Sequence, residues 1–394
     1  RAKAYFFGGQ FDQAGEFASQ AQHLAQHHND QAQLAESFST LGNVASRRGD
    51  LAQAETHLRE TITIWEKLDN PLGIARNTST IGMIYYRQGN ADDAQIYFEK
   101  AHGIYRTIGD KLGMATTFNY FGYVCVARND YEGAKQYYLQ SLPLMKEVGD
   151  QRGIALLLGN IGWIFNTQGQ HQEAIGYYQQ SLELAKQTGN KHLVTVQLQE
   201  LGNSYCALGN YEKGMAYMED CLAMRRNIGD TIGIAYVLNV LAMSHYRQGN
   251  YERALACGEE CLQIGKEAGE KNMIIGGLNV LGNTYALQGD ARAKDYFMEA
   301  LRLAYDTHNA LGIEMNVLSM AWVYIMNNQP HQAGELLGLM QSQPQLNSDF
   351  HADIRLMMPS LREIISEDDL SASLDRGKLL NLDDVAQRLL AEFS

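Results

Sequence analysis

Apolar side chains recur at intervals of three and four residues over long stretches of the chain, such as Leu112 to Arg128 and Tyr131 to Val148. This spacing brings the apolar side chains to one face of an α-helix, so each stretch predicts an amphipathic helix. Pairs of Gly and a polar residue, such as Gly149-Asp150, separate the stretches. Gly readily adopts the left-handed conformation that ends a helix, and Asn or Asp caps the next one. The pattern therefore predicts antiparallel helix pairs.

The same pattern returns every 40 residues, which predicts one solenoid in place of the two or three globular domains that the length alone suggests. Its clearest mark is an apolar residue followed by a small one inside the first helix of each pair. Gly inside a helix costs about 1 kcal/mol relative to Ala, so the position predicts a close approach by the second helix. The step occurs at Leu41-Gly42, Ile81-Gly82, Phe121-Gly122, Ile161-Gly162, Leu201-Gly202, Leu241-Ala242, Leu281-Gly282 and Met320-Ala321.

Landmark residues of these units resemble those of the tetratricopeptide repeat (TPR) family. The Leu, Gly, Tyr, Ala, Phe, Ala and Leu of that family fall on Leu201, Gly202, Tyr205, Gly214, Met218, Cys221 and Leu222. The 40-residue length is similar to that of the Pins/LGN adaptors and of the sensor domains of bacterial STAND and MalT-like regulators. The resemblance covers residues 1 to about 340. It implies an all-α, right-handed α-solenoid of about nine tandem helix pairs, whose first helices line a concave face.

Two parts are expected along the chain. Residues 1–340 form the repeat superhelix. Residues 341–394 fall outside the period and are expected to form capping helices, because the last pair of a solenoid otherwise exposes its apolar face. Helical patterns cover 349–365 and 379–393, and the stretch from Ser366 to Asp369 between them predicts an acidic surface turn.

The N-terminal end of the sequence lacks a starting Met, and the first helix of the first unit is truncated to a stub at residues 1 to 8. We therefore expect that an upstream effector or NTPase domain is missing from this sequence. No apolar stretch approaches the roughly 18 residues of a membrane-spanning helix. Five cysteines are an odd number, thinly spread, which favours a cytoplasmic location over a disulfide framework.

The charge balance argues against two classes of partner. The chain has 45 acidic and 32 basic residues and a formal net charge of −13. A negative surface opposes attraction to phosphate backbones and anionic lipids. We therefore expect neither nucleic acid nor a membrane as a direct partner.

No motif in the sequence supports catalysis or the binding of a cofactor or metal. Gly258 and Gly265-Lys266 have the wrong spacing for a phosphate-binding loop and lie in a predicted helix. Cys257 and Cys261 are four residues apart, but no second pair of Cys or His stands at ligand spacing. We therefore expect that the protein is not an enzyme. We expect its cysteines to be buried and to have structural roles.

Aligned positions of the first helices predict a peptide-binding groove. Three columns of residues, three and four positions apart, share one helix face and contain no acid or Lys, although 20% of the chain is charged. Amides can pair with a peptide backbone, while Trp, Tyr and Met give adaptable apolar contacts. The candidate groove residues are Met83, Tyr86, Asn119, Tyr123, Trp163, Asn166, Gln199, Asn203, Asn239, Met243, Tyr246, Asn279, Asn283 and Trp322.

Other interpretations of the same residues stay open. A tightly coiled superhelix would bury much of this face against itself. Arg76, Arg87 and Arg247 near the rim are suited to a carboxylate of a partner, but solvated helix positions explain them equally well. The favoured function is a protein–protein interaction module that binds a peptide or protein segment, as the sensor part of a larger STAND-type regulator. The alternatives are a passive oligomerisation or assembly scaffold and a sensor of a small molecule or peptide signal.

Overall fold

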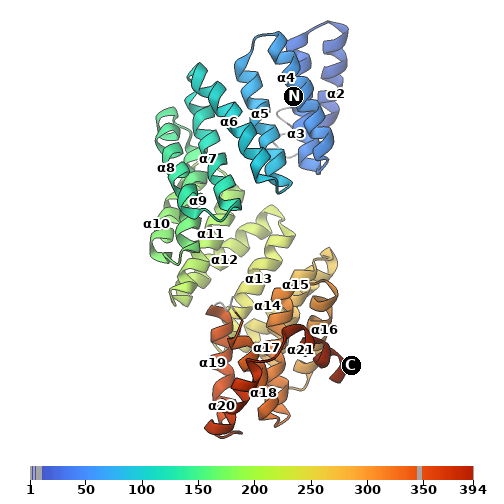
Figure 1. Ribbon diagram of the computed structural model, residues 1–394, viewed down its shortest axis with the longest axis vertical. Helices are drawn as coiled ribbons and strands as arrows, with labels where there is room; N and C mark the ends of the chain where they lie inside the picture. The colour runs from blue at the N-terminus through green and yellow to red at the C-terminus, as the bar shows by residue number, and fades with distance from the viewer. Residues whose placement is uncertain (1, 3–4, 6–10, 344–347, 394) are drawn as a thin grey trace. The chain divides into compact units, whose positions relative to one another are not determined.

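The computed structural model describes residues 2, 5, 11–343 and 348–393, and within these ranges every regular element is an α-helix. The chain divides into two compact units, residues 1–204 and 205–394, which are described separately. Figure 1 labels the helices, whose numbering starts at α2. Those of unit 1 are α2 (Phe11–His27), α3 (Gln31–Arg48), α4 (Leu51–Lys67), α5 (Pro71–Arg87), α6 (Ala91–Ile108), α7 (Lys111–Ala127), α8 (Tyr131–Val148), α9 (Gln151–Thr167), α10 (His171–Gln187) and α11 (Lys191–Ala207), whose last turn crosses the boundary.

Unit 2 continues the helix pairs and ends in three further helices. Its repeats are α12 (Tyr211–Ile228), α13 (Thr231–Arg247), α14 (Tyr251–Ala268), α15 (Lys271–Leu287), α16 (Arg292–Asp306), α17 (Ala310–Met326) and α18 (Pro330–Gln341). The three C-terminal helices are α19 (Ser348–Arg362), α20 (Glu367–Gly377) and α21 (Leu382–Glu392). No helix of the described ranges is long and apolar enough to cross a membrane.

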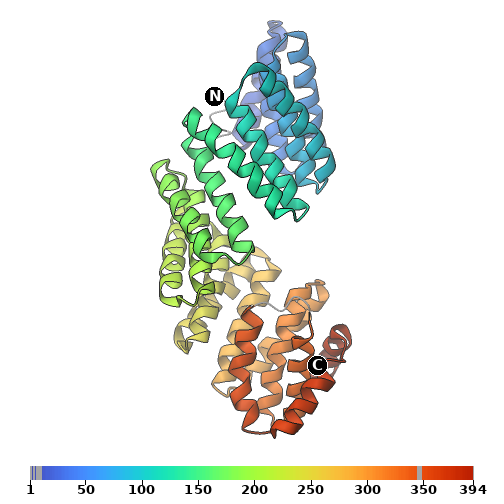
Figure 2. The same ribbon diagram turned by 60° about the vertical axis from the view of Figure 1, so that its left-hand side comes forward.

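The helix ends follow the predicted punctuation. Gly109 has φ of 70°, in the left-handed region, and ends α6. The side chain of Asp110 then accepts a hydrogen bond of 3.1 Å from the backbone N–H of Gly113 and caps α7. Similar caps close most of the other repeats, so consecutive helices lie antiparallel (Figure 2). The predicted all-α stack of helix pairs is confirmed; its N-terminal stub lies mostly outside the described residues.

The small residue of the first helix is explained by the packing of each pair. A Cβ placed on Gly82 of α5 would lie 2.6 Å from a ring carbon of Phe98 on α6. One on Gly162 of α9 would lie 2.8 Å from the ring of Tyr178 on α10. These rings are fully buried, and no real Cβ approaches a neighbour so closely. The close approach of the second helix that the sequence predicted is confirmed, and in these pairs an aromatic side chain of the second helix packs directly on the backbone of the first.

The C-terminal helices correct part of the sequence analysis. The stretch from Ser366 to Asp369 is not a surface turn: Ser366 Oγ accepts a hydrogen bond of 3.2 Å from the Asp369 N–H and caps α20. Acidic residues of the first turn, such as Glu367, favour a helix start because they face the positive end of the helix dipole. Helix α20 packs along α18, whereas α19 packs on α17 and α18, and α21 on α16 and α17.

Candidate functional site

In unit 1 the predicted groove residues lie on the first helices α5, α7, α9 and α11, and all remain partly accessible. Trp163 of α9 is 37% exposed. The others are half-buried: Met83, Tyr86, Asn119, Tyr123, Asn166, Gln199 and Asn203. We call Met83, Tyr86, Asn119, Tyr123, Trp163 and Asn203 the unit 1 face. It is an accessible surface of aromatic, Met and amide side chains.

Contacts with neighbouring helices hold the side chains of the unit 1 face in place. The rings of Tyr86 and Tyr123 stack with centroids 5.9 Å apart, and burial raises the pKa of Tyr86. Asn160 Nδ2 of α9 donates a hydrogen bond of 3.0 Å to Asn119 Oδ1 of α7. The Trp163 ring meets the edge of the Tyr131 ring at 5.9 Å. These contacts restrict the side chains of the unit 1 face, so a ligand that covered them would incur a smaller entropy cost for ordering them.

In unit 2 the equivalent face is closed, which corrects the prediction of an open groove there. Tyr246, Asn279, Asn283 and Trp322 are at most 3% exposed, and only Asn239 and Met243 remain half-buried.

Direct packing of the first helices is one cause of this closure. A Cβ on Gly276 of α15 would lie 2.8 Å from Asn239 Oδ1 of α13, so the two helices lie very close. Asn279 Nδ2 donates to Ser319 Oγ of α17 at 2.9 Å, and Asn283 Nδ2 donates to Asn279 Oδ1 at 2.9 Å. These two amides therefore bond to their own unit, and burial of the face against itself is the interpretation that fits unit 2.

The second cause of closure is helix α19. Its apolar side chains, at positions separated by four, three and four residues, belong to the same buried cluster as Trp322: Phe350, Ile354, Met357 and Leu361. Asp353 of α19 accepts from Arg247 of α13, with Arg247 Nε 3.3 Å from Asp353 Oδ1. The sequence analysis considered a carboxylate of a partner protein for Arg247. Arg247 does pair with a carboxylate, but this carboxylate belongs to Asp353 of the same chain. Burial and the nearby Asp353 carboxylate raise the pKa of Tyr246.

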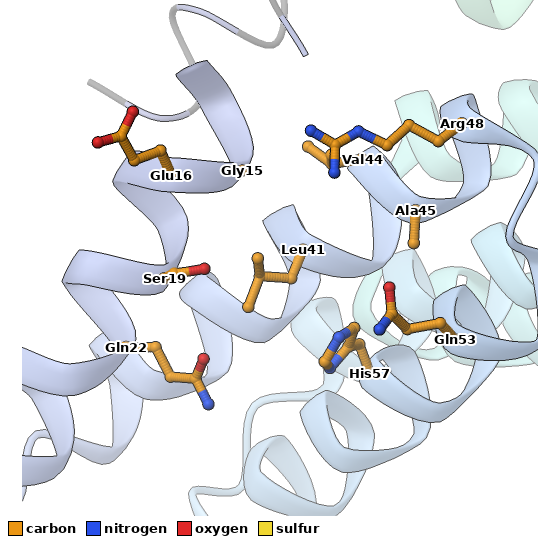
Figure 3. A pocket seen from close by; sticks show the side chains of 10 residues that line it. All are labelled: Gly15, Glu16, Ser19, Gln22, Leu41, Val44, Ala45, Arg48, Gln53 and His57. Carbon is orange, nitrogen blue, oxygen red and sulfur yellow. The ribbon is translucent and has the colours of Figure 1, made fainter. Parts of the chain in front are cut away.

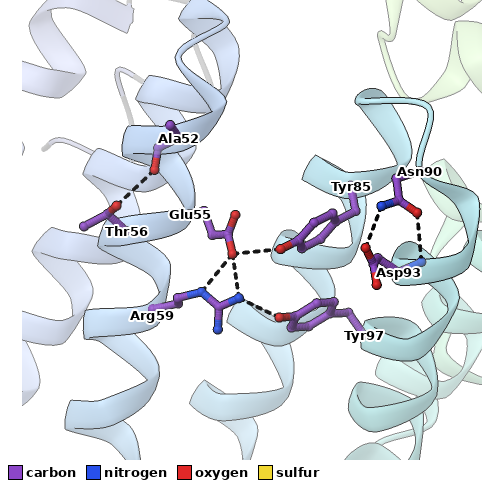
Figure 4. Close-up of polar contacts among 8 residues, drawn as sticks. All are labelled: Ala52, Glu55, Thr56, Arg59, Tyr85, Asn90, Asp93 and Tyr97. Atoms are coloured by element: carbon purple, nitrogen blue, oxygen red, sulfur yellow. Dashed lines mark hydrogen bonds and ion pairs between the residues drawn. The ribbon is translucent and has the colours of Figure 1, made fainter.

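A polar cluster that the sequence analysis missed joins three successive helices of unit 1 (Figure 4). Glu55 Oε1 of α4 accepts from Arg59 Nε at 2.8 Å and from the Tyr85 hydroxyl of α5 at 3.0 Å. Arg59 Nη2 donates to the Tyr97 hydroxyl of α6 at 2.6 Å. Because Tyr85 and Tyr97 also stack at 5.2 Å, the cluster links neighbouring repeats.

Other chemistry is sparse. Among the described residues, no group of three His, Cys, Asp or Glu is placed to hold a metal ion. Burial raises the pKa of Cys261 to about 12, which keeps this thiol protonated and unreactive. A hollow of about 380 Å³ lies where α2, α3 and α4 meet. Figure 3 shows its polar side chains, such as Ser19 and His57, spread around the wall without converging on one point.

Comparison with protein families finds matches along most of the repeats. Models described as tetratricopeptide repeat match residues 34–68, 73–147, 136–187 and 193–267, together more than half of the chain. Among curated proteins, none matches this sequence.

Three solved structures illustrate the similarity of fold. A STAND (signal transduction ATPase with numerous domains) protein with a tetratricopeptide repeat sensor, from Pyrococcus horikoshii, has a TM-score of 0.65 at 21% identity, over 78% of this chain and 45% of that one. The apo form of RapI has a TM-score of 0.51 at 15% identity, over 76% of this chain and 98% of that one. The Rap conjugation gene regulator of plasmid pLS20, solved with the Phr* peptide, has a TM-score of 0.50 at 14% identity, over 72% and 76%. This chain therefore spans less than half the length of the Pyrococcus protein.

Proposed function

The chain belongs to the tetratricopeptide repeat family, and from that premise we propose that its unit 1 face binds a peptide or a segment of a partner protein. Tetratricopeptide repeats are protein–protein interaction modules and not enzymes, which gives the general class of this chain. The finer proposal concerns which surface binds and what it binds.

The observation that carries the proposal is the contrast between Trp163 and its counterpart Trp322. Trp163 is 37% exposed on α9, whereas Trp322 is 3% exposed in the closed face of unit 2. Covering a large exposed aromatic side chain with a ligand lowers the free energy of the complex by about 25 cal/mol per Å² of apolar surface removed from water. Trp and Tyr are also the side chains that most often dominate binding energy at interfaces. The unit 1 face offers both, with no competing charge in its columns.

The similar structures support a regulatory setting for this binding. One regulator was solved with a peptide, and another protein carries its tetratricopeptide repeats as a sensor. We therefore extend the proposal to a sensor role: the chain recognises a protein segment and passes the signal to another part of a larger regulatory protein.

The proposal is tested by selecting peptides from a random display library on the full chain and measuring their affinity by fluorescence anisotropy. The double variant Trp163→Ala with Asn203→Ala is expected to weaken binding of the selected peptides at least tenfold. The control pair Ile96→Ala with Leu139→Ala removes apolar side chains that are each 46% exposed on the second helices α6 and α8. We expect this control to change affinity by less than twofold. Equal effects of the two double variants would refute the assignment of the face.

A further inference from the structure

Helix α19 shows what kind of ligand the first-helix face of this chain accepts. It packs on α17, and its apolar side chains Phe350, Ile354, Met357 and Leu361 are at most 5% exposed. Asp353, on the same helix, pairs with Arg247 at the end of α13. The occupant of the unit 2 face is therefore an amphipathic helix with one carboxylate directed to an arginine.

Side chains of the first-helix face of unit 2 recur in unit 1, four repeats earlier. The run Tyr86-Arg87-Gln88-Gly89-Asn90 at the end of α5 is identical to residues 246–250 at the end of α13. The correspondence continues along the neighbouring first helices. The matched pairs are Met83 with Met243, Tyr86 with Tyr246, Arg87 with Arg247, Asn119 with Asn279, and Trp163 with Trp322.

Arg87 differs from Arg247 in lacking a carboxylate. Arg87 Nη1 donates to Ser46 Oγ at 3.0 Å, and among the described residues no acid pairs with it. Loss of solvation and the nearby Arg47 cation both lower the pKa of Arg87. Two neighbouring arginines without an acid are unusual in a chain whose net charge is −13. A carboxylate placed beside Arg87 would offset this repulsion.

The unit 1 face also keeps more space than its counterpart. Gly276, which brings α15 against Asn239 of α13, corresponds to Thr116 of α7. Helices α13 and α15 accordingly pack more closely than α5 and α7. Tyr123 stands where unit 2 has Asn283, so the surface offered by unit 1 is also more aromatic.

We propose that the unit 1 face binds an amphipathic helix of a partner protein, which presents an apolar stripe spaced like that of α19 and a carboxylate to Arg87. The inference rests on the proposed function and makes it narrower: the ligand is a helix with an acidic residue, and not an extended or basic peptide. A helix that binds in a groove in this way places apolar anchor residues at positions i, i+3 or i+4 and i+7, which lie on one face of the helix.

The test uses the full chain and a fluorescent synthetic peptide with the sequence of residues 348–362 as the probe. We expect the peptide to bind, and Arg87→Glu to weaken its binding at least tenfold. Arg106→Glu is the matched control, because Arg106 is also an exposed arginine in the last turn of a unit 1 helix. The control should change affinity less than twofold. Circular dichroism melting of both variants checks that each remains folded.

A charge swap makes the test specific. A peptide with Asp353→Lys should bind the Arg87→Glu chain at least fivefold more tightly than the original peptide does. Absence of probe binding, or binding that responds to Arg247→Glu but not to Arg87→Glu, would overturn the inference. If display-selected peptides still depend on Trp163 in that case, the proposed function stands and only the helical, acidic nature of the ligand is wrong.

Discussion

Arg247 on α13 and Asp353 on α19 form an ion pair although 106 residues separate them along the chain. Their side chains are 17% and 14% exposed, so the pair is largely shielded from water. It fixes one helix of the C-terminal segment on the first-helix face of unit 2. The same face of unit 1 has the matching arginine, Arg87, and no acid beside it among the described residues. The first-helix face of unit 2 is therefore covered by a helix of the same chain, whereas the unit 1 face, which we propose as the recognition surface, has no such helix among the described residues.

Removing the carboxylate of this pair is expected to loosen α19. Asp353→Ala removes the carboxylate that faces the largely buried Arg247 cation, which should lower the free energy of unfolding of unit 2 by about 3 kcal/mol. Hydrogen exchange measured by mass spectrometry should show faster exchange in α19 and at the end of α13.

The control for this variant is Asp375→Ala, which breaks the exposed pair between Asp375 of α20 and Lys378, the residue that follows this helix. Such surface pairs contribute at most about 1 kcal/mol, so exchange in α19 should remain unchanged. Equal protection of α19 in Asp353→Ala and in the unaltered chain would show that apolar packing alone holds the helix.

Two glycines of one helix pair should respond to alanine in opposite directions. At Gly82 a Cβ would lie 2.6 Å from the Phe98 ring, and Gly82→Ala should destabilise unit 1 by about 1 to 3 kcal/mol through overpacking. At Gly103, in the middle of α6, a Cβ would meet no atom within 4 Å. There Gly103→Ala should stabilise by up to about 1 kcal/mol, because Ala has the higher helix propensity. Urea unfolding of both variants measures the two effects, and a destabilised Gly103→Ala chain would contradict this packing argument.

The helix pairs and their ends could be predicted from the sequence because both depend on local interactions. Gly109 and Asp110, for example, carry the helix end and the next cap in two adjacent residues. The start of α20 had a local signal as well, since Ser366 precedes a run of acids, but charge alone suggested a turn.

The state of the two first-helix faces could not be predicted in the same way. Gly276 looks like any glycine of a helix until the side chain of Asn239 from α13 is seen against it. The 40-residue period ends before α19, so no spacing relates Asp353 to Arg247. The closure of unit 2 depends on these long-range contacts. The repeat pattern marks the same helix positions in both units, so it does not distinguish an open face from a closed one.

The stability of unit 2 is expected to fall in mild acid because of His245. Burial, and next the nearby Arg253 cation, lower the pKa of His245 below its ordinary value of 6.5, whereas Glu219 acts in the opposite direction. The unfolded chain therefore binds a proton at a higher pH than the folded one. Stability from this group is complete above about pH 6.5 and is lost as the pH falls from that value through the lower pKa of the folded state.

The variant His245→Tyr tests this prediction, because tyrosine occupies the equivalent position in other repeats, as at Tyr205 and Tyr285. Urea midpoints measured between pH 7.5 and 5.5 should fall less steeply for the variant than for the unaltered chain. His308→Tyr, which replaces a histidine in a helix connection, serves as the control. Parallel midpoint curves for His245→Tyr and the unaltered chain would contradict the assignment.

The central claim is that unit 1 offers the available recognition surface while unit 2 is filled by its own α19. Photo-crosslinking tests it most directly, with display-selected peptides that carry a benzophenone group and mass spectrometry to locate the adducts on the full chain. We expect adducts on α5, α7 and α9, close to Met83, Tyr123 and Trp163, and their loss in the double variant Trp163→Ala with Asn203→Ala. Adducts concentrated on the second helices, or on α13 and α17 with α19 displaced, would contradict it.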